Sequence, residues 1–188
     1  MRKLFLSPSL FLSPSLFLSP SLFLSPSGRI SRRSFIIGVT GLVIFIVLQL
    51  FAWRYVGINM ASFFFALALF FLNFHMLMAI YGKRLHDLGR TLWPLIGLLT
   101  LIIFVWIVMA LNYGGIEYFD TVMAHPEYAD NAEEMKKVLQ VYQDKLAAGM
   151  PKARWVLAIL PVLFTLWLAV APGQEGDNRY GAAADTTQ

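Results

Sequence analysis

The chain has 188 residues, of which 58% are hydrophobic and 14% charged, and this composition indicates a membrane protein, not a water-soluble domain. It contains no cysteine, which excludes disulfides, thiolate metal sites, a cysteine nucleophile and cysteine lipidation. The formal charge of +4 is attributed to membrane orientation and anionic headgroups, because the sequence has no nucleic-acid-binding motif.

The N-terminal segment, residues 4–27, consists of four identical copies of LFLSPS. Its twelve Leu and Phe residues favour insertion by about 0.5 kcal/mol each, roughly 6 kcal/mol in total. Interior prolines cost about 3 kcal/mol each, so Pro14 and Pro20 cancel this gain. We therefore expect residues 1–27 to be a disordered low-complexity segment that does not span the membrane. The alternative of a secretory signal is disfavoured, because the prolines break its apolar core and no small-residue cleavage site follows.

Apolar segments of the length needed to cross the hydrocarbon core, roughly 20 residues, occur in the rest of the chain. Only one of them contains a charge, Arg154 at its edge. The sequence therefore predicts an all-α polytopic protein in which residues 28–181 form a membrane domain and residues 182–188 a flexible tail. The four predicted transmembrane helices are residues 35–53, 60–81, 92–111 and 153–171.

Basic residues flank the predicted spans on one side. By the positive-inside rule these residues are cytoplasmic, and four spans place both termini on that side. The polar segment 112–152 is then extracytoplasmic. The basic residues are Arg29, Arg32 and Arg33 before the first span, and Lys83, Arg84 and Arg90 after the second.

The polar segment 112–152 contains a predicted amphipathic helix at residues 132–148. Asn131 and Glu134 have the spacing of an N-cap and its partner, and Gly149 with Pro151 predicts the end of the helix. A shorter helix is indicated by Ile116, Phe119 and Met123. The apolar stripe of the longer helix comprises Met135, Val138, Leu139, Tyr142 and Leu146.

The motif KRLHDLGRTLW, residues 83–93, lies between the second and third predicted spans. Gly89 is expected to end the preceding helix, and the three-residue spacing of Asp87 from Arg84 and Arg90 allows ion pairs. His86 and Asp87 are adjacent and point in different directions, so they do not form an acid-base dyad. The favoured interpretation is a structured basic turn. The other is a contact site for a partner or an anionic lipid, with His86 as a pH-sensitive element.

The C-terminal segment PGQEGDNRYG, residues 172–181, predicts tight turns. We expect it to fold back on the basic turn, with Asp177 or Glu175 near Arg84 or Arg90, and Arg179 near Asp87. The candidate contact residues for a partner or lipid are Arg32, Arg33, Lys83, Arg84, His86, Asp87, Arg90, Asn178 and Arg179.

Polar residues inside the predicted spans, Gln49, Asn73 and His75, do not cluster at one depth. Interhelical hydrogen bonds are the favoured interpretation, and a solute pathway is the alternative. Gly38 and Gly41 offer a small-residue face for close helix packing. The three histidines cannot share one metal, and the sequence predicts no catalytic residue, cofactor or metal site.

Three segments, GRISRR at residues 28–33, KRLHDLGRTLW and PGQEGDNRYG, together resemble the YhaH-like bacterial inner-membrane proteins, the family of domain of unknown function 805. The resemblance covers roughly residues 28–181. It implies a location in the bacterial inner membrane and brings no established activity or cofactor. The chain departs from the family pattern at Ser34–Phe35, at Pro94 and in the polar segment 112–152.

The functional expectation is a non-enzymatic accessory or scaffold protein that contacts anionic lipid headgroups, another membrane protein or a second copy of itself through its cytoplasmic face. The alternative is a small-solute or ion transporter or channel formed by oligomerisation.

Overall fold

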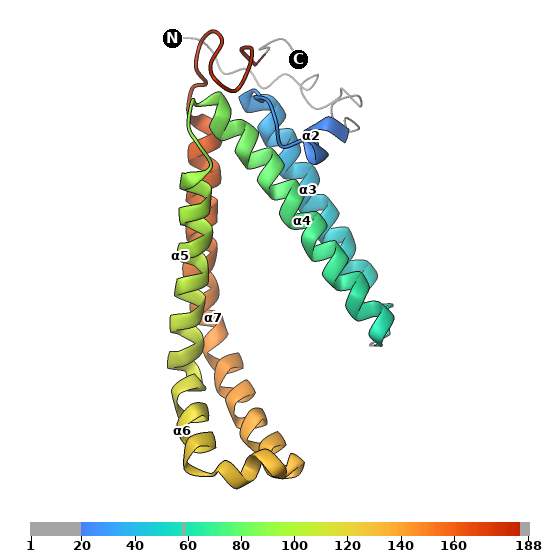
Figure 1. The fold of residues 1–188 in the computed structure, drawn as a ribbon, viewed down its shortest axis with the longest axis vertical. Helices are drawn as coiled ribbons and strands as arrows, with labels where there is room; N and C mark the ends of the chain where they lie inside the picture. The colour runs from blue at the N-terminus through green and yellow to red at the C-terminus, as the bar shows by residue number, and fades with distance from the viewer. Residues whose placement is uncertain (1–19, 58, 185–188) are drawn as a thin grey trace. The chain divides into compact units, whose positions relative to one another are not determined.

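The structure is a computed structural model that describes residues 20–57 and 59–184 (Figure 1). In these ranges it consists of helices joined by turns and irregular segments, with one isolated β-bridge. The expectation of disorder for residues 1–19 lies outside the described residues. The helices are α2 (Pro20–Leu24), α3 (Arg32–Trp53), α4 (Met60–Asp87), α5 (Trp93–Ala110), α6 (Ile116–Ala124) and α7 (Ala132–Val170), with a π-helical turn at Leu111–Gly115 and a 3-10 helix at Pro126–Asp130.

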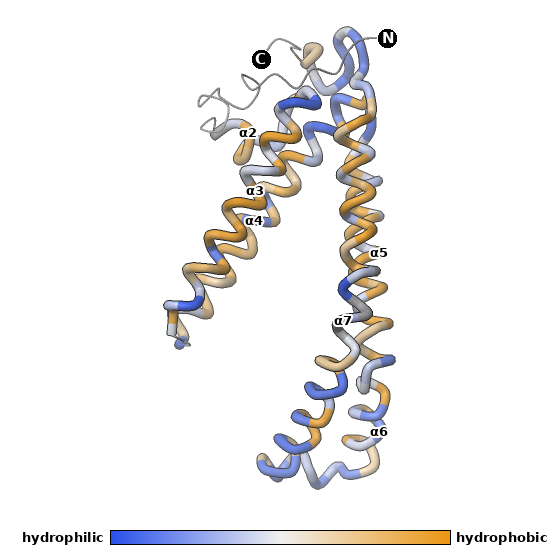
Figure 2. Tube along the Cα trace, turned by 180° about the vertical axis from the view of Figure 1, so that it is seen from behind, coloured by the Kyte–Doolittle hydropathy of each residue, from blue (hydrophilic) through white to orange (hydrophobic). Residues whose placement is uncertain are grey.

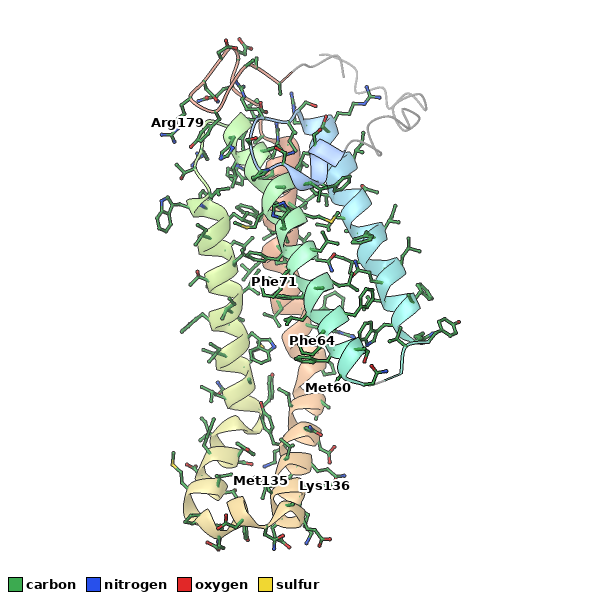
Figure 3. All side chains as sticks on the ribbon, turned by 45° about the vertical axis from the view of Figure 1, so that its right-hand side comes forward. Met60, Phe64, Phe71, Met135, Lys136 and Arg179 are labelled. Carbon is green, nitrogen blue, oxygen red and sulfur yellow. The ribbon has the colours of Figure 1, made fainter. Side chains whose placement is uncertain are left out.

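Three helical segments are long and apolar enough to cross a membrane: α3, α4 and the stretch Trp93–Ala124, which begins with α5 and ends with α6. Hydrophobic residues run along these helices (Figure 2). Their large apolar side chains are mostly exposed, as Phe71 on α4 is at 60% (Figure 3 labels it), which is the arrangement of helices solvated by lipid. The predicted all-α class is confirmed for the described residues, and the long apolar helices agree with the predicted membrane class. The apolar part of α7, Leu157–Val170, is shorter than these three, so four spans are not established.

Local hydrogen bonds fix both ends of α4. At its start Asn59 and Ser62 form a capping box, with Ser62 N donating to Asn59 Oδ1 at 2.8 Å and Asn59 N to Ser62 Oγ at 2.9 Å. At its end Gly89 has φ +70°, and Arg90 N donates to Leu85 O at 2.9 Å in a Schellman motif. The predicted stop at Gly89 is confirmed, and the helix extends past the predicted apolar span through the basic residues to Asp87.

The chain forms two compact units, and the first contains residues 20–92 and 167–184. In it α3 packs against α4 through Gly38, where an added Cβ would lie 3.2 Å from Ile80 Cγ2. Phe35 and Tyr81 meet edge to face at 5.3 Å. The predicted small-residue contact is therefore confirmed at Gly38. The end of the repeat array, residues 20–24, forms the short helix α2 against α4, which differs from the disorder expected for residues 1–27.

The second unit contains residues 93–166. The helix that begins with α5 is interrupted at Tyr113 and Gly114, whose backbone angles are not helical, and resumes as α6. This confirms the predicted short helix. The ring of Tyr118 on α6 lies 5.5 Å from that of Tyr142 on α7, and Lys145 pairs with Glu117.

The start of α7 agrees with the sequence prediction, whereas its end does not. Asn131 Oδ1 accepts from the backbone N–H groups of Glu133 and Glu134 at 3.1 and 3.3 Å, as an N-cap should. The predicted stop at Gly149 and Pro151 is wrong, because α7 continues to Val170. Gly149 instead makes room for the Tyr113 ring, which an added Cβ would overlap. The glycine therefore serves a long-range contact and not a helix end.

Candidate functional site

The polar end of the first unit, defined as residues 28–32, 84–90 and 171–181, is organised around the buried side chain of Arg84. Arg84 Nε donates to Leu168 O at 2.9 Å, and Nη2 donates to Ala171 O at 2.5 Å. These carbonyls belong to the C-terminal end of α7, where the last carbonyls have no partner within the helix and the helix dipole attracts a cation. Arg84 therefore caps α7.

Asp87 lies between two buried guanidinium groups. Its Oδ2 accepts from Arg84 Nη1, and its Oδ1 accepts from Arg29 Nε at 3.2 Å. Both arginine side chains are 1% exposed and the aspartate 5%, so the three charges form a desolvated cluster. Gly173 lies directly against the carboxylate, where an added Cβ would overlap Asp87.

Arg29 connects this cluster to the C-terminal segment. Its Nη2 donates to Gln174 O at 2.6 Å, and its Nη1 donates to Gly176 O at 2.6 Å and to Gly181 O at 3.3 Å. Because the acceptors are backbone carbonyls, Arg29 fixes the path of the chain and not a particular side chain. Gln174 N in turn donates to Asp87 O at 2.8 Å.

The C-terminal segment is also held by Asn178 and Tyr180. Asn178 Nδ2 donates to His86 O at 2.9 Å, and Asn178 Oδ1 accepts from Tyr180 N at 2.9 Å. This turn places the Tyr180 ring parallel to the His86 imidazole, with centroids 3.9 Å apart. His86 Nδ1 lies 3.4 Å from Gly28 O, and since a carbonyl only accepts, the proton is on that nitrogen.

The prediction that the C-terminal segment folds back on the basic turn agrees with these contacts, and so does the predicted pairing of Asp87 with Arg84, but the ion pairs predicted between the segment and the turn do not form. Asp87 pairs with Arg84 and Arg29, not with Arg179, whose guanidinium lies 4.7 Å from the centre of the Tyr180 ring. Arg90 lies 5.6 Å from the centre of the Trp167 ring. The buried cations take backbone carbonyls that need donors, so no acidic side chain of the segment is required there.

Asp177 also differs from its predicted role near Arg84 or Arg90, since its Oδ1 accepts from Ala183 N at 3.1 Å.

The predicted contact residues differ in how far they are buried. Lys83, Arg84 and Asp87 are buried; Arg33, His86 and Asn178 are half-buried; Arg32, Arg90 and Arg179 are exposed (Figure 3 shows Arg179). The sequence analysis missed four residues of this site as contacts: Arg29, Gly173, Gln174 and Tyr180. The only sequence signal for them is that they belong to the GRISRR and PGQEGDNRYG segments.

A cleft of about 630 Å³ opens at the polar end. Ser31, the N-cap of α3, and residues 172–176 contribute to its lining. Arg84 and Asp87 reach it but are already paired with each other, so its exposed charged groups are Arg32 and Glu175. This lining can bind a small polar or charged group through one guanidinium.

The polar residues inside the spans make interhelical hydrogen bonds. Gln49 Nε2 donates to Asn73 Oδ1 at 3.3 Å, and Asn73 Nδ2 donates to Gln49 Oε1 at 2.8 Å, which joins α3 to α4. His75 bonds to the carbonyl of Leu24 at 2.8 Å. The favoured interpretation of Gln49 and Asn73 is therefore confirmed, whereas the expectation that they lie at different depths is wrong for this pair. Each amide group bonds to the other.

Among the described residues, no group of three or more His, Cys, Asp or Glu side chains could hold a metal ion. His125 and Glu127, in the polar segment, make an exposed pair at 3.0 Å. The pKa of Glu127 lies below its usual value because its own backbone N–H, and then His125, donate to the carboxylate.

Comparison with known proteins gives one match. The sequence profile of a family described as "Protein of unknown function (DUF805)" matches residues 23–182, a range that includes all three segments of the polar end. Neither the curated proteins nor the solved structures contain a match.

Proposed function

Since the chain belongs to the DUF805 family, whose description gives no activity, we propose from the geometry of the polar end that it is a non-enzymatic accessory protein of the bacterial inner membrane that binds anionic lipid headgroups. The observation behind this proposal is that the arginines of the polar end fall into a buried group and an exposed group. Arg29 and Arg84 are buried and saturated, whereas Arg32, Arg90 and Arg179 are exposed at the same end of the unit.

The exposed cations lie where headgroups are expected. Arg90 follows α4 and precedes Trp93, which is 73% exposed at the start of α5 and has the position of an interfacial tryptophan. A cation near an anionic leaflet contributes about 1 kcal/mol. Three such cations together contribute about 3 kcal/mol, or roughly a hundredfold in lipid affinity, while the buried cluster keeps the segments that carry them in place.

The topology supports a fourth span and a cytoplasmic polar end. Trp93 follows the basic turn directly, and the end of α7 is bonded to Arg84 of that turn. If α5 crosses the membrane, the chain must cross again to return to Arg84, and the apolar end of α7 is the described segment that precedes this return. The positive-inside rule then places the polar end in the cytoplasm.

The test is lipid retention in purified protein reconstituted with equal amounts of phosphatidylglycerol and phosphatidylcholine, measured by native mass spectrometry. The triple variant Arg32→Gln, Arg90→Gln, Arg179→Gln is expected to lose its preference for phosphatidylglycerol. The control, Lys136→Gln, Lys137→Gln, Lys145→Gln, removes the same charge from α7 and should keep the preference. Equal loss in both variants would reduce the effect to net charge and overturn the proposal.

A further inference from the structure

The last part of the repeat array occupies a defined place on α4. In α2, which Figure 1 labels, the side chain of Leu22 is only 6% exposed. The helix has just five residues. Lys83 Nζ donates to Ser21 O at 2.5 Å, and His75 Nε2 donates to Leu24 O at 2.8 Å. One buried leucine and two hydrogen bonds therefore hold this segment.

The two hydrogen bonds have a simple chemical origin. A helix of five residues satisfies few of its own carbonyls, and those of Ser21 and Leu24 accept from side chains. Near lipid these carbonyls need donors. Lys83 and His75, on α4, supply them, and the buried Lys83 ammonium gains an acceptor in return. Because carbonyls are common to all residues, the site selects mainly for the leucine between them.

The same sequence occurs elsewhere in the chain. The docked segment is Pro-Ser-Leu-Phe-Leu at residues 20–24, and residues 8–12 and 14–18 repeat it without change. We propose that the face of α4 between His75 and Lys83 is a binding site for Pro-Ser-Leu-Phe-Leu segments, at which residues 14–18, and less often residues 8–12, replace residues 20–24.

The length of the connection to Arg29 sets the order of preference. Four residues separate Leu24 from Arg29, ten separate Leu18 from it and sixteen separate Leu12. Since the probability of closing a flexible loop falls as the 3/2 power of its length, residues 14–18 should occupy the site about fourfold less often than residues 20–24. Residues 8–12 should occupy it about eightfold less often. The repeats thus supply several occupants for one site, independently of headgroup binding.

Photocrosslinking tests the proposal in this naturally cysteine-free chain. A benzophenone maleimide is attached at the same position of three successive copies, in the single variants Leu12→Cys, Leu18→Cys and Leu24→Cys. Crosslinked α4 peptides are then quantified by mass spectrometry. Relative to the intramolecular yield of Leu24→Cys, the expected yields are about a quarter for Leu18→Cys and about an eighth for Leu12→Cys. Leu22→Glu should reduce the Leu24→Cys yield at least tenfold and raise the Leu18→Cys yield about fourfold, since a buried carboxylate is costly.

Leu16→Glu is the matched control, because Leu16 occupies the position of Leu22 in the preceding copy. It should leave the Leu24→Cys yield unchanged and abolish that of Leu18→Cys. Leu22→Ala, which adds no charge, should shift the yields in the same direction as Leu22→Glu. The proposal is overturned if Leu18→Cys gives no α4 crosslink in any background, or if its crosslinks join only two different chains.

Discussion

Replacing Asp87 with asparagine is the sharpest perturbation of the polar end. Asp87 is the only acidic side chain that pairs with Arg29 and Arg84 among the described residues, and all three are at least 95% buried, with exposures of 1%, 1% and 5%. Removing one member of a buried ion pair typically costs 3–5 kcal/mol. Both arginines keep carbonyl acceptors in the variant, so we expect the lower value, about 3 kcal/mol, for release of the C-terminal segment.

Amide hydrogen exchange at Gln174 in lipid nanodiscs measures this release. Gln174 N donates to the backbone carbonyl of Asp87, so the reporter bond does not involve the altered side chain. A loss of about 3 kcal/mol raises the opening equilibrium, and with it the exchange rate, about 150-fold. The control Asp177→Asn keeps the carbonyl oxygen that accepts from Ala183 N and should change the rate less than twofold. If Asp87→Asn also changed it less than twofold, the cluster would not hold the segment.

Three further outcomes are expected. Gly173→Ala should accelerate amide exchange at Gln174, because the added Cβ overlaps the Asp87 carboxylate. Gly97→Ala is the control, because its added Cβ meets open space. Equal exchange rates at Gln174 in the two variants would contradict the close packing of Gly173 on Asp87. In a double-mutant cycle with Gln49→Leu and Asn73→Leu, thermal unfolding should show a coupling of about 0.6–1.7 kcal/mol, and strict additivity would contradict the reciprocal amide pair. The pKa of Glu127, followed by carbon-13 NMR, should lie below that of an ordinary glutamate. Its contact with His125 should therefore persist at neutral pH and be lost as pH falls through this lowered pKa. His125→Ala should raise the pKa of Glu127, and an unchanged pKa would show that His125 is not a cause.

The sequence contains the information for the helices and for their local ends. Uncharged apolar runs gave α3 and α5 to within a few residues, because lipid requires continuous helices of that length. Gly89 and Asn131 act through their nearest neighbours along the chain, so their roles as helix stop and N-cap were predictable. The pairing of Asp87 with Arg84 follows from the same local geometry.

Features that depend on distant residues were not predictable from one sequence. Arg29 is 58 residues from Asp87, and no periodicity connects them. Gly149 and Pro151 resemble a helix end, but the glycine accommodates Tyr113 while α7 continues. Residues 20–24 are held on α4 by donors to their carbonyls and by the burial of Leu22. In each case a tertiary contact decides between local alternatives.

One labelling experiment decides whether the segment before α3 and the C-terminal segment share the cytoplasmic side of the membrane. Single cysteines at Ser27, Ala183 and Glu133 are treated in intact cells with an impermeant maleimide, and then again after permeabilisation. We predict that Glu133→Cys reacts at once, and that Ser27→Cys and Ala183→Cys react only after permeabilisation. Reaction of Ala183→Cys but not Ser27→Cys in intact cells would contradict the shared polar end, and reaction of both without Glu133→Cys would reverse its orientation.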